Sequence, residues 1–357
     1  MKKRIIALIC LALAALCIYG AVRIVLRLLS PAYGFSYAVL EDGTAVVTRY
    51  GGRKTELEIP ASLDGHPVSR IGEKAFFWNI RLESVAVPEG VAEIGGGAFA
   101  GCERLARADL PKSLEVIGEK AFADCAALDG IAIPGNVAEI GGGAFTGCAG
   151  LTRIALPAGV ALTGENPFSD CPRLTRVEVA PEHPALAVDG GALFDRDGAR
   201  LVWVSQAAEA AEYAIPPGTA VVGGGAFQNC AGLTRVDVPG GVTAIGDHAF
   251  YGCRKLAAID LPEGVASIGN GAFSNCAGLA RAALPQGLAE IGYLAFYNCR
   301  ALSAVDIPDS VTAIGDGAFI GCRDLTLTVG RHSYAEIYSR NNGLRFVWRS
   351  ESAAATE

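Results

Sequence analysis

Nine of the eleven cysteines recur at one position of a repeated pattern, and their thiols are the residues here with the most evident chemical potential. None of the nine lies in a Cys-x-x-Cys pair, the spacing on which zinc-ribbon and dithiol redox sites depend. Each follows a recurring phenylalanine by three residues and precedes a recurring leucine by three, so it falls among core positions. We therefore predict a ladder of buried thiols that act as small hydrophobic side chains. The nine are Cys102, Cys125, Cys148, Cys171, Cys230, Cys253, Cys276, Cys299 and Cys322.

Disulfides between neighbouring coils are the alternative for these thiols. Stacked coils about 4.8 Å apart would bring two of them within bonding distance. Side chains that point the same way in register favour free thiols instead, and an odd number of nine cannot pair completely.

Two further patterns resemble chemical motifs but lack their defining residues. Glycine triplets such as Gly95-Gly96-Gly97 have neither the Gly-Lys-Ser/Thr ending of a phosphate loop nor a Gly-x-Gly-x-x-Gly opening into a helix, so we interpret them as bends. The run Asp195-x-Asp197-Gly198 starts like a calcium loop without its later acidic ligands, which favours a turn. No nucleophile stands beside a base in a recognisable motif. The histidines lie in separate segments: His66, His183, His248 and His332.

These patterns predict a chain with no catalytic, cofactor-binding or metal site and no small-molecule substrate. A catalytic alternative would have to be built on the mid-chain segment that holds Asp195 and Asp197. The formal net charge is −7, with acidic and basic residues interspersed. This balance argues against a nucleic-acid partner and against binding to an anionic membrane surface.

The elements that must position these residues are coils with a period of 23 residues. A fixed period of this size predicts a stacked solenoid, in which no coil can bury its apolar face alone. The period breaks once, because 59 residues separate the fifth recurring phenylalanine from the sixth. These phenylalanines are Phe76, Phe99, Phe122, Phe145, Phe168, Phe227, Phe250, Phe273, Phe296 and Phe319.

One coil, at 233–250, illustrates the predicted course of the chain. Arg235 and Asp237 would face outward on a short strand, while the valine after each of them faces inward. Pro239 ends the strand because it has no N–H to donate. Phe250 then fills the coil and stacks on its counterparts above and below. We expect about ten such coils, with one parallel β-sheet along one side and short turns or helical turns on the other.

The N-terminal segment favours a membrane anchor. Residues 1–4 form a basic cap, and Ile5 to Val22 run for 18 residues without a charge, long enough for a transmembrane helix. The basic residues before this run predict a cytoplasmic N-terminus with the repeats outside. The alternative is a cleaved signal peptide, which would make the protein secreted.

The other boundaries follow from turns and from the repeat. Asp42-Gly43 between apolar runs predicts a hairpin that caps the first coil, and Asp197-Gly198 predicts a second hairpin at the break. Ser333 to Arg340 is typical of a short helix, and Leu344 to Trp348 of a final strand. The predicted segments are a cytoplasmic basic cap at 1–4, a transmembrane anchor with a juxtamembrane segment at 5–29, an N-terminal hairpin cap at 30–71, repeats at 72–180, an inserted hairpin at 181–215, repeats at 216–329, a C-terminal cap at 330–349 and a disordered tail at 350–357.

Outward positions two and four residues after each strand leucine form the natural binding surface of such a solenoid. The simpler interpretation of the charges there is a solvated face of paired arginines and carboxylates. The alternative is a recognition face on which Arg153, Arg176 and Arg235 bind carboxylates of a partner. Exposed aromatic anchors are scarce, so the affinity would be weak and multivalent. The candidate residues are Arg107, Asp109, Arg153, Arg176, Glu178, Arg235, Asp237, Asp260, Arg281 and Asp306.

The pattern Ala-Phe-x-x-Cys-x-x-Leu-x-x-Ile-x-Leu-Pro-x-x-Val-x-x-Ile-Gly, over about residues 57 to 329, resembles the BspA-type (treponemal-type) bacterial leucine-rich repeat. The resemblance implies a right-handed solenoid of the leucine-rich-repeat type on a bacterial surface or secreted protein, with adhesion or protein binding in some members. We therefore expect a non-enzymatic, membrane-anchored surface protein whose sheet face binds a protein or a glycan. The alternative is a structural or scaffolding protein of the cell envelope without a discrete ligand.

Overall fold

The computed structural model describes residues 32–206 and 211–349. The predictions of a basic cap at 1–4, a transmembrane anchor at 5–29 and a disordered tail at 350–357 fall outside the described residues. Within the described ranges, no helix is both long enough and apolar enough to cross a membrane.

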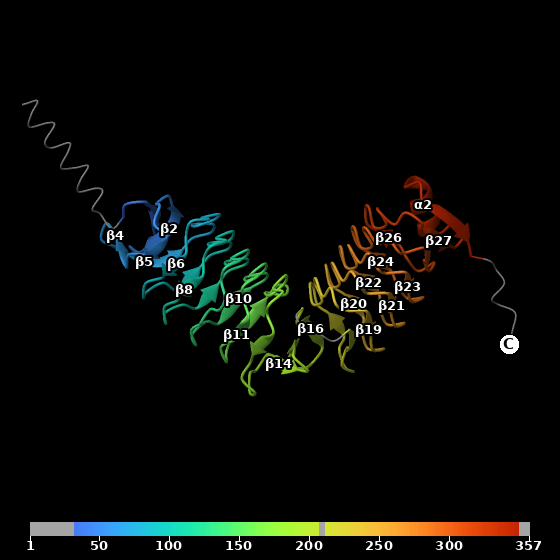
Figure 1. Ribbon diagram of the computed structural model, residues 1–357, viewed down its shortest axis with the longest axis horizontal. Helices are drawn as coiled ribbons and strands as arrows, with labels where there is room; N and C mark the ends of the chain where they lie inside the picture. The colour runs from blue at the N-terminus through green and yellow to red at the C-terminus, as the bar shows by residue number, and fades with distance from the viewer. Residues whose placement is uncertain (1–31, 207–210, 350–357) are drawn as a thin grey trace, which may run out of the picture.

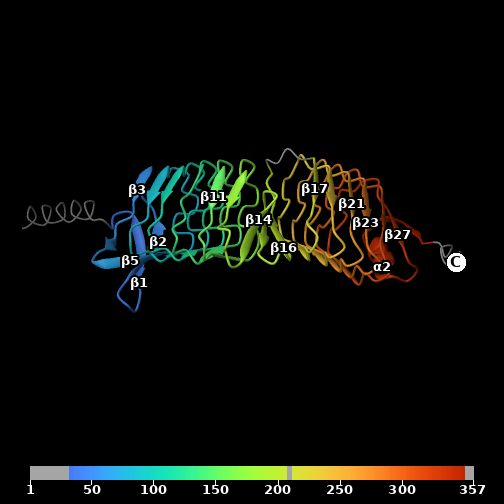
Figure 2. The same ribbon diagram turned by 90° about the horizontal axis from the view of Figure 1, so that it is seen from below.

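The coils stack side by side into one elongated solenoid of about 13 turns, bent into a shallow V near its middle (Figure 1). Figure 2, turned by 90°, shows the coils as closely spaced parallel rows. There are more turns than the ten predicted coils, because strands of the cap and of the inserted hairpin join the stack. In the cap, β2 (Ala45–Tyr50) pairs in parallel with β5 (His66–Ile71). At the break, β16 (Arg200–Trp203) pairs in parallel with β18 (Val221–Val222).

The first ladder of short parallel strands comes from the Leu-x-x-Ile-x-Leu-Pro part of the repeat. Its strands are paired in four separate sheets, and in each the coils align residue for residue, as Arg153 does with Arg176. The ladder consists of β3 (Glu56–Glu58), β6 (Ser84–Ala86), β8 (Arg107–Asp109), β11 (Arg153–Ala155), β13 (Arg176–Glu178), β17 (Glu212–Ala214), β19 (Arg235–Asp237), β21 (Ala258–Asp260), β23 (Arg281–Ala283), β25 (Ala304–Asp306) and β27 (Thr326–Val329).

A second ladder of parallel strands forms the opposite wall, so the prediction of a single parallel sheet was wrong. Buried backbone groups in a stack must find partners in the next coil all the way round, and extended Val-x-x-Ile segments pair as readily as the first strands do. Gly95 N–H, for example, donates to the carbonyl of Ile71 at 2.8 Å. Besides β5, β16 and β18 it contains β7 (Glu93–Ile94), β9 (Val116–Ile117), β10 (Glu139–Gly141), β12 (Ala161–Thr163), β20 (Ala244–Ile245), β22 (Ser267–Ile268), β24 (Glu290–Ile291) and β26 (Ala313–Ile314).

Stacked phenylalanine rings fill the space between the two ladders. In the second block of coils, the centroid of Phe250 lies 4.8 Å from that of Phe227 and 5.1 Å from that of Phe273, with nearly parallel rings. All ten recurring phenylalanines are buried, which confirms the predicted core. At the break the column changes: Trp203 meets Phe168 edge-on at 6.4 Å.

Each end of the stack is closed by a distinct cap. At the N-terminal end, β1 (Phe35–Val39) and β2 form the predicted antiparallel hairpin, and β4 (Ser62–Leu63) pairs with β5. Gly43 in its turn has a φ of 82°, which is why the turn needs a glycine. At the C-terminal end, α2 (Tyr334–Asn341) and β28 (Arg345–Trp348) confirm the predicted helix and strand.

The insertion at the break is a three-stranded antiparallel unit. The predicted hairpin is confirmed, with β15 (Ala192–Asp195) paired to β16, and β14 (Leu186–Asp189) adds a third strand beside β15. Because β16 also pairs with the next coil, the unit is part of the second stack instead of looping out from it. The wall of the first block ends at β12 and is a separate sheet, so the unit extends the wall of the second block only. Its side chains pack into both cores, since Trp203 belongs to the core of the first block and Leu201 to that of the second.

Candidate functional site

The outward strand face is the set of exposed side chains on the first ladder. Each strand places a buried residue between two outward ones, as β19 does with Arg235 and Asp237, and this confirms the predicted alternation. Nine of the ten candidate residues on this face are in ion pairs within the chain. The pairs are Arg107–Asp109 at 2.9 Å, Arg176–Glu178 at 3.0 Å, Arg235–Asp237 at 2.8 Å, Arg281–Asp260 at 2.8 Å and Arg349–Asp306 at 2.6 Å.

These pairs neutralise most of the charge on the face. Arg107 donates from Nε to Oδ1 of Asp109, and this hydrogen bond raises the pKa of the arginine. The hydrogen bond from Arg235 to Asp237 raises the pKa of that arginine in the same way. The side chains are well exposed, 72% for Arg107, so water and salt weaken the attraction. These exposed pairs are what the simpler interpretation, a solvated face of paired charges, predicts.

Arg153 is the exception. Among the arginines that the described strands of this face carry, it is the one with no ion-pair or hydrogen-bond partner. It lies in register with Arg176 on the neighbouring strand, while Ala155 and Glu178 occupy the next outward positions. The two adjacent strands thus carry two guanidinium groups and one carboxylate, which is paired with Arg176, so this part of the face keeps an excess positive charge. A guanidinium group without a partner can bind a carboxylate or a sulfate through two parallel hydrogen bonds.

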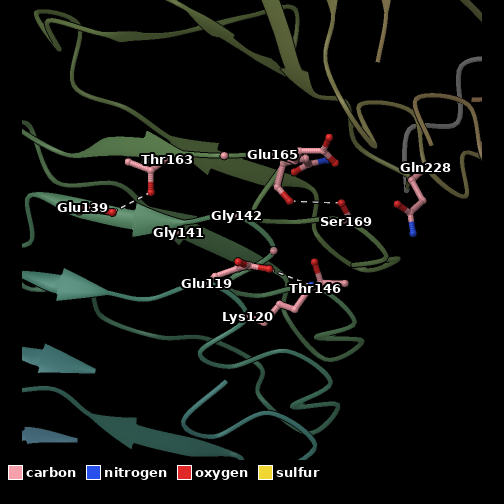
Figure 3. A pocket seen from close by; sticks show the side chains of 13 residues that line it. Glu119, Lys120, Glu139, Gly141, Gly142, Thr146, Thr163, Glu165, Ser169 and Gln228 are labelled. Atoms are coloured by element: carbon pink, nitrogen blue, oxygen red, sulfur yellow. Dashed lines mark hydrogen bonds and ion pairs between the residues drawn. The ribbon is translucent and has the colours of Figure 1, made fainter. Parts of the chain in front are cut away.

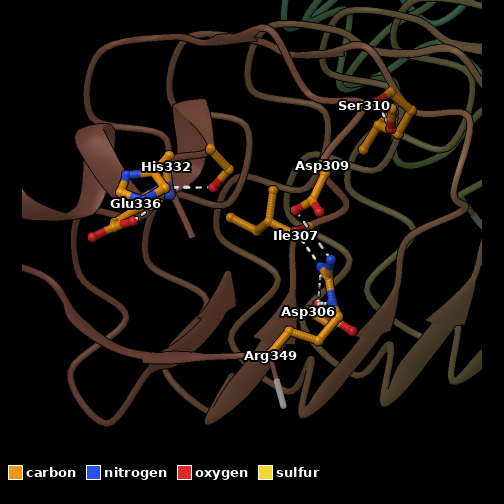
Figure 4. A network of polar contacts seen from close by, with 9 residues as sticks. Asp306, Ile307, Asp309, Ser310, His332, Glu336 and Arg349 are labelled. Atoms are coloured by element: carbon orange, nitrogen blue, oxygen red, sulfur yellow. Dashed lines mark hydrogen bonds and ion pairs between the residues drawn. The ribbon is translucent and has the colours of Figure 1, made fainter. Parts of the chain in front are cut away.

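The C-terminal end of the face is occupied by the chain itself (Figure 4). Arg349 contacts Asp306 at 2.6 Å and Asp309 at 3.0 Å, and it also donates to the carbonyl oxygen of Ile307 at 2.7 Å. Asp306 is thereby engaged by the C-terminal cap. The sequence gives no sign of this contact, because Arg349 lies 43 residues further on, outside the repeat.

Most thiols of the cysteine ladder are unreactive, and Cys322 in the last coil is the exception, because a hydrogen bond with Cys299 lowers its pKa. All nine thiols are free and buried, which confirms the prediction, and eight of them donate to the phenylalanine carbonyl of the preceding coil, as Cys276 does to Phe250 at 3.0 Å. Burial raises the pKa of Cys102 to about 12. A thiol that stays protonated is a poor nucleophile and a poor metal ligand. The ladder therefore serves the fold.

The acidic residues of the mid-chain hairpin belong to its turn. Oδ1 of Asp197 accepts from the N–H of Ala199 at 3.1 Å, and Gly198 has a φ of 73°, so the predicted turn is confirmed. Burial raises the pKa of Asp195, whose neighbours are Arg200 and Asp197. Across residues 32–206 and 211–349, no three His, Cys, Asp or Glu side chains come together in a way that could hold a metal ion.

A notch of about 610 Å³ opens where the two blocks of coils meet (Figure 3). Glu119, Glu139 and Glu165 line it from the first block, and Gln228 lines it from the second. Glu119 pairs with Lys120 at 2.9 Å, and Glu139 accepts from Thr163 at 2.9 Å. Burial raises the pKa of Glu165, and Asp247 adds to the rise. The sequence could not place this notch, because it lies where the repeat period breaks.

Comparisons with known proteins agree with this geometry. The model of the BspA type leucine rich repeat region matches six copies, at residues 65–184 and 206–327. A leucine rich cell surface protein from Faecalibacterium prausnitzii is 25% identical, with 90% of this chain and 94% of that chain covered and a TM-score of 0.52. A comparison with curated proteins found no match.

Two further solved structures share the fold at lower identity. The pneumococcal vaccine antigen PcpA is 18% identical, with 88% of this chain and 96% of that chain covered and a TM-score of 0.66. A leucine-rich repeat protein from Eubacterium ventriosum is 22% identical, with 81% of this chain and 92% of that chain covered and a TM-score of 0.50.

Proposed function

Because this chain belongs to the BspA-type leucine-rich repeat family, we propose that it is a non-enzymatic bacterial surface protein whose outward strand face binds a protein or a glycan. The apolar run from Ile5 to Val22 would hold it in the membrane, with the N-terminus inside and the repeats outside. Likeness to a cell surface protein of Faecalibacterium prausnitzii supports the location. A secreted form, made by cleavage after this run, is the alternative.

The observation that carries the binding proposal is the unpartnered guanidinium group of Arg153 beside Arg176. The other arginines on the described strands of this face have carboxylate partners, so they gain less from a ligand. A partner with carboxylate or sulfate groups would find free donors at Arg153 and neighbouring donors at Arg176. Large aromatic side chains are absent from these two strands, so we expect modest affinity per site and gain from multivalent contact.

Charge reversal on this part of the face tests the proposal. The full chain is applied to a printed panel of glycans and extracellular-matrix proteins, and binding is compared with that of Arg153→Glu/Arg176→Glu. We expect the double variant to lose at least about tenfold in affinity, because one charge-assisted hydrogen bond is worth about 1.5–3 kcal/mol. Arg173→Glu is the matched control, since Arg173 is exposed on the same coil but precedes the strand. Equal binding by all three proteins, with unchanged circular dichroism, would place the site elsewhere.

A scaffolding role without a discrete ligand is the second candidate. The ion pairs that occupy nine of the ten face residues favour it, because a surface that satisfies its own charges needs no partner. This role predicts that cells tolerate Arg153→Glu/Arg176→Glu but lose the protein's function when Ile5 to Val22 is deleted. A phenotype of the charge reversal equal to that of the deletion would contradict scaffolding and favour binding.

A further inference from the structure

A polar groove of about 430 Å³ runs along one edge of the second block of coils. It lies on the turns that precede the strands of the first ladder, so none of its residues belongs to the outward strand face. The polar and charged side chains that line it are Asn229, Tyr251, Arg254, Asn275, Asn298 and Arg300.

The three asparagines of the groove have a backbone explanation. Each lies two residues after a recurring phenylalanine, with φ of 57° at Asn229, 60° at Asn275 and 58° at Asn298. Asparagine, aspartate and glycine adopt this left-handed conformation most readily. The amides are also held in place, since Nδ2 of Asn298 donates to Oδ1 of Asn275 at 3.2 Å. The fold thus provides a fixed row of amides whether or not a ligand binds.

The two arginines have no such explanation. Arg254 and Arg300 are exposed, and neither side chain has an acceptor within residues 32–206 and 211–349. They lie four residues after a recurring phenylalanine, where the coil between them carries Ala277. One coil lies between them, so their backbones are two coil spacings, or roughly 10 Å, apart. In a chain with a net charge of −7, two guanidinium groups without partners beside one groove mark a local positive site.

The groove also has unused hydrogen-bonding groups on the coils of the two arginines. Oη of Tyr251 and Oδ1 of Asn298 have no hydrogen-bond partner in the part of the chain that the structure describes. The ring of Tyr251 is half-buried and meets His248 edge-on at 5.8 Å. An aromatic ring with a polar tip contacts an apolar face and a hydroxyl group at once. Amides both donate to and accept from hydroxyl groups.

We propose that this groove binds an acidic oligosaccharide. Arg254 and Arg300 bind anionic groups on sugars that lie two coils apart, and the amides and Tyr251 contact hydroxyl groups and a ring face between them. A lone anion engages one guanidinium group, whereas a chain with repeated carboxylates engages both. Apolar anchors, which a peptide partner would need, are missing from the groove lining. The inference goes beyond the strand-face proposal, and either can fail without the other.

Titration of the full chain with trigalacturonic acid tests this site. We expect binding that weakens as salt rises, and a loss of at least about tenfold in Arg254→Gln/Arg300→Gln, because two charge-assisted contacts disappear. Arg323→Gln is the matched control: Arg323 is exposed, lies at the same repeat position two residues after Gly321 and has a side chain without a partner among the described residues, but it does not line the groove. The control should bind within about twofold of the unchanged protein, since it leaves both charge-assisted contacts in place.

Two further ligands separate an oligosaccharide site from a simple anion site. Maltotriose, which has the hydroxyl groups but no charge, should bind at least about tenfold more weakly than the acidic trimer. Inorganic phosphate at equal ionic strength should not displace the trimer. The proposal is overturned if the trimer does not bind, if Arg323→Gln weakens binding as much as the double variant, or if phosphate displaces the trimer. Arg153→Glu/Arg176→Glu should leave this binding unchanged, which distinguishes its failure from failure of the strand-face proposal.

Discussion

At the scale of single residues, the recurring phenylalanine and cysteine share the work of filling each coil. The ring of Phe250 lies between those of Phe227 and Phe273, at 4.8 and 5.1 Å, and is completely buried. The thiol of Cys276 then donates to the carbonyl oxygen of Phe250 at 3.0 Å. The phenylalanine supplies buried area, and the cysteine adds a second hydrogen bond to a carbonyl oxygen that already accepts from the N–H of Cys253 at 3.1 Å. Both roles are structural.

Truncation of one ring measures the first of these roles. Phe250→Ala should lower the free energy of unfolding by roughly 3–5 kcal/mol, because a buried aromatic loses both its transfer energy and its packing. Phe77→Ala is the control, since Phe77 is 50% exposed and its loss should cost less than about 1 kcal/mol. Denaturant titration followed by circular dichroism gives both values. Similar losses for the two variants would show that Phe250 is not part of a tightly packed column.

At this scale, the position of a residue in the repeat predicts whether its side chain is buried. It is a poorer guide to which polar side chains contact one another. The place of each cysteine between a phenylalanine and a leucine was enough to predict a buried free thiol. The ion pair between Arg107 and Asp109 also follows from their spacing of two residues on a strand. The contact of Arg349 with Asp306 does not, because it depends on how the C-terminal cap folds back over the last coils.

At the scale of elements, the C-terminal helix is held by a single carboxylate. Glu336 accepts from Arg340 at 2.8 Å and from the backbone N–H of His332 at 2.7 Å, while its own N–H donates to the Ser333 hydroxyl. The hydrogen bond from Arg340, followed by that from His332, lowers the pKa of Glu336 to about 2. This is the capping arrangement that closes a helix N-terminus. It stabilises the first turn of α2, while buried Ala335 and Tyr338 hold the helix against the end of the stack.

The lowered pKa makes the stability of this cap depend on pH. The folded pKa lies below the ordinary value of 4.5, so the contribution of Glu336 is fully present above about pH 4.5 and is lost as the pH falls toward 2. Glu336→Gln should therefore lower the melting temperature at pH 6 and make little difference near pH 2. Glu182→Gln, at an exposed carboxylate, is the control and should shift melting equally little at both values. A constant difference for Glu336→Gln across this range would contradict the assignment.

Element types were predictable where the sequence pattern is local, and the pairing between elements was less so. Asp42-Gly43 predicted the first hairpin and Ser333 the start of the last helix, because turn and cap residues act over a few positions. The second strand ladder was missed, since Val-x-x-Ile segments such as Val91 to Ile94 are too short to indicate a strand by alternation alone. These segments become strands because their backbones form hydrogen bonds with the neighbouring coils, as β7 does with β5 and β9.

At the scale of the whole molecule, two blocks of coils behave as one stack because a few residues connect them at the break. Asn166 is 2% exposed, and its Nδ2 donates to the carbonyl oxygen of Gly225 at 2.9 Å. Its Oδ1 accepts at 2.8 Å from the N–H of Phe168, which has no partner coil in the usual place. One amide thus replaces the backbone ladder where the period fails. The sequence did not single it out, because it falls in the part that does not repeat.

Replacing this amide tests the connection. Asn166→Leu keeps the approximate size but leaves the N–H of Phe168 buried without a partner, which should cost roughly 2 kcal/mol. The carbonyl of Gly225 loses the bond from Asn166 and keeps the one from the N–H of Gln228. Asn136→Ala removes an exposed amide that donates to the carbonyl oxygen of Lys112, so it should cost much less. Equal losses of unfolding free energy for these two variants would mean that Asn166 does not join the blocks.

Our central claim is that the repeated positions determine stability and the variable positions determine binding. It can be tested on one set of proteins. Unfolding free energy and affinity for the ligand found on the panel are measured side by side for the unchanged chain, Phe250→Ala and Arg153→Glu/Arg176→Glu. Our account predicts that Phe250→Ala loses roughly 3–5 kcal/mol of stability yet keeps its affinity under conditions where it is folded. The charge reversal should keep its stability and lose at least about tenfold in affinity. A charge reversal that leaves affinity unchanged, or a Phe250→Ala variant that folds fully but no longer binds, would contradict it.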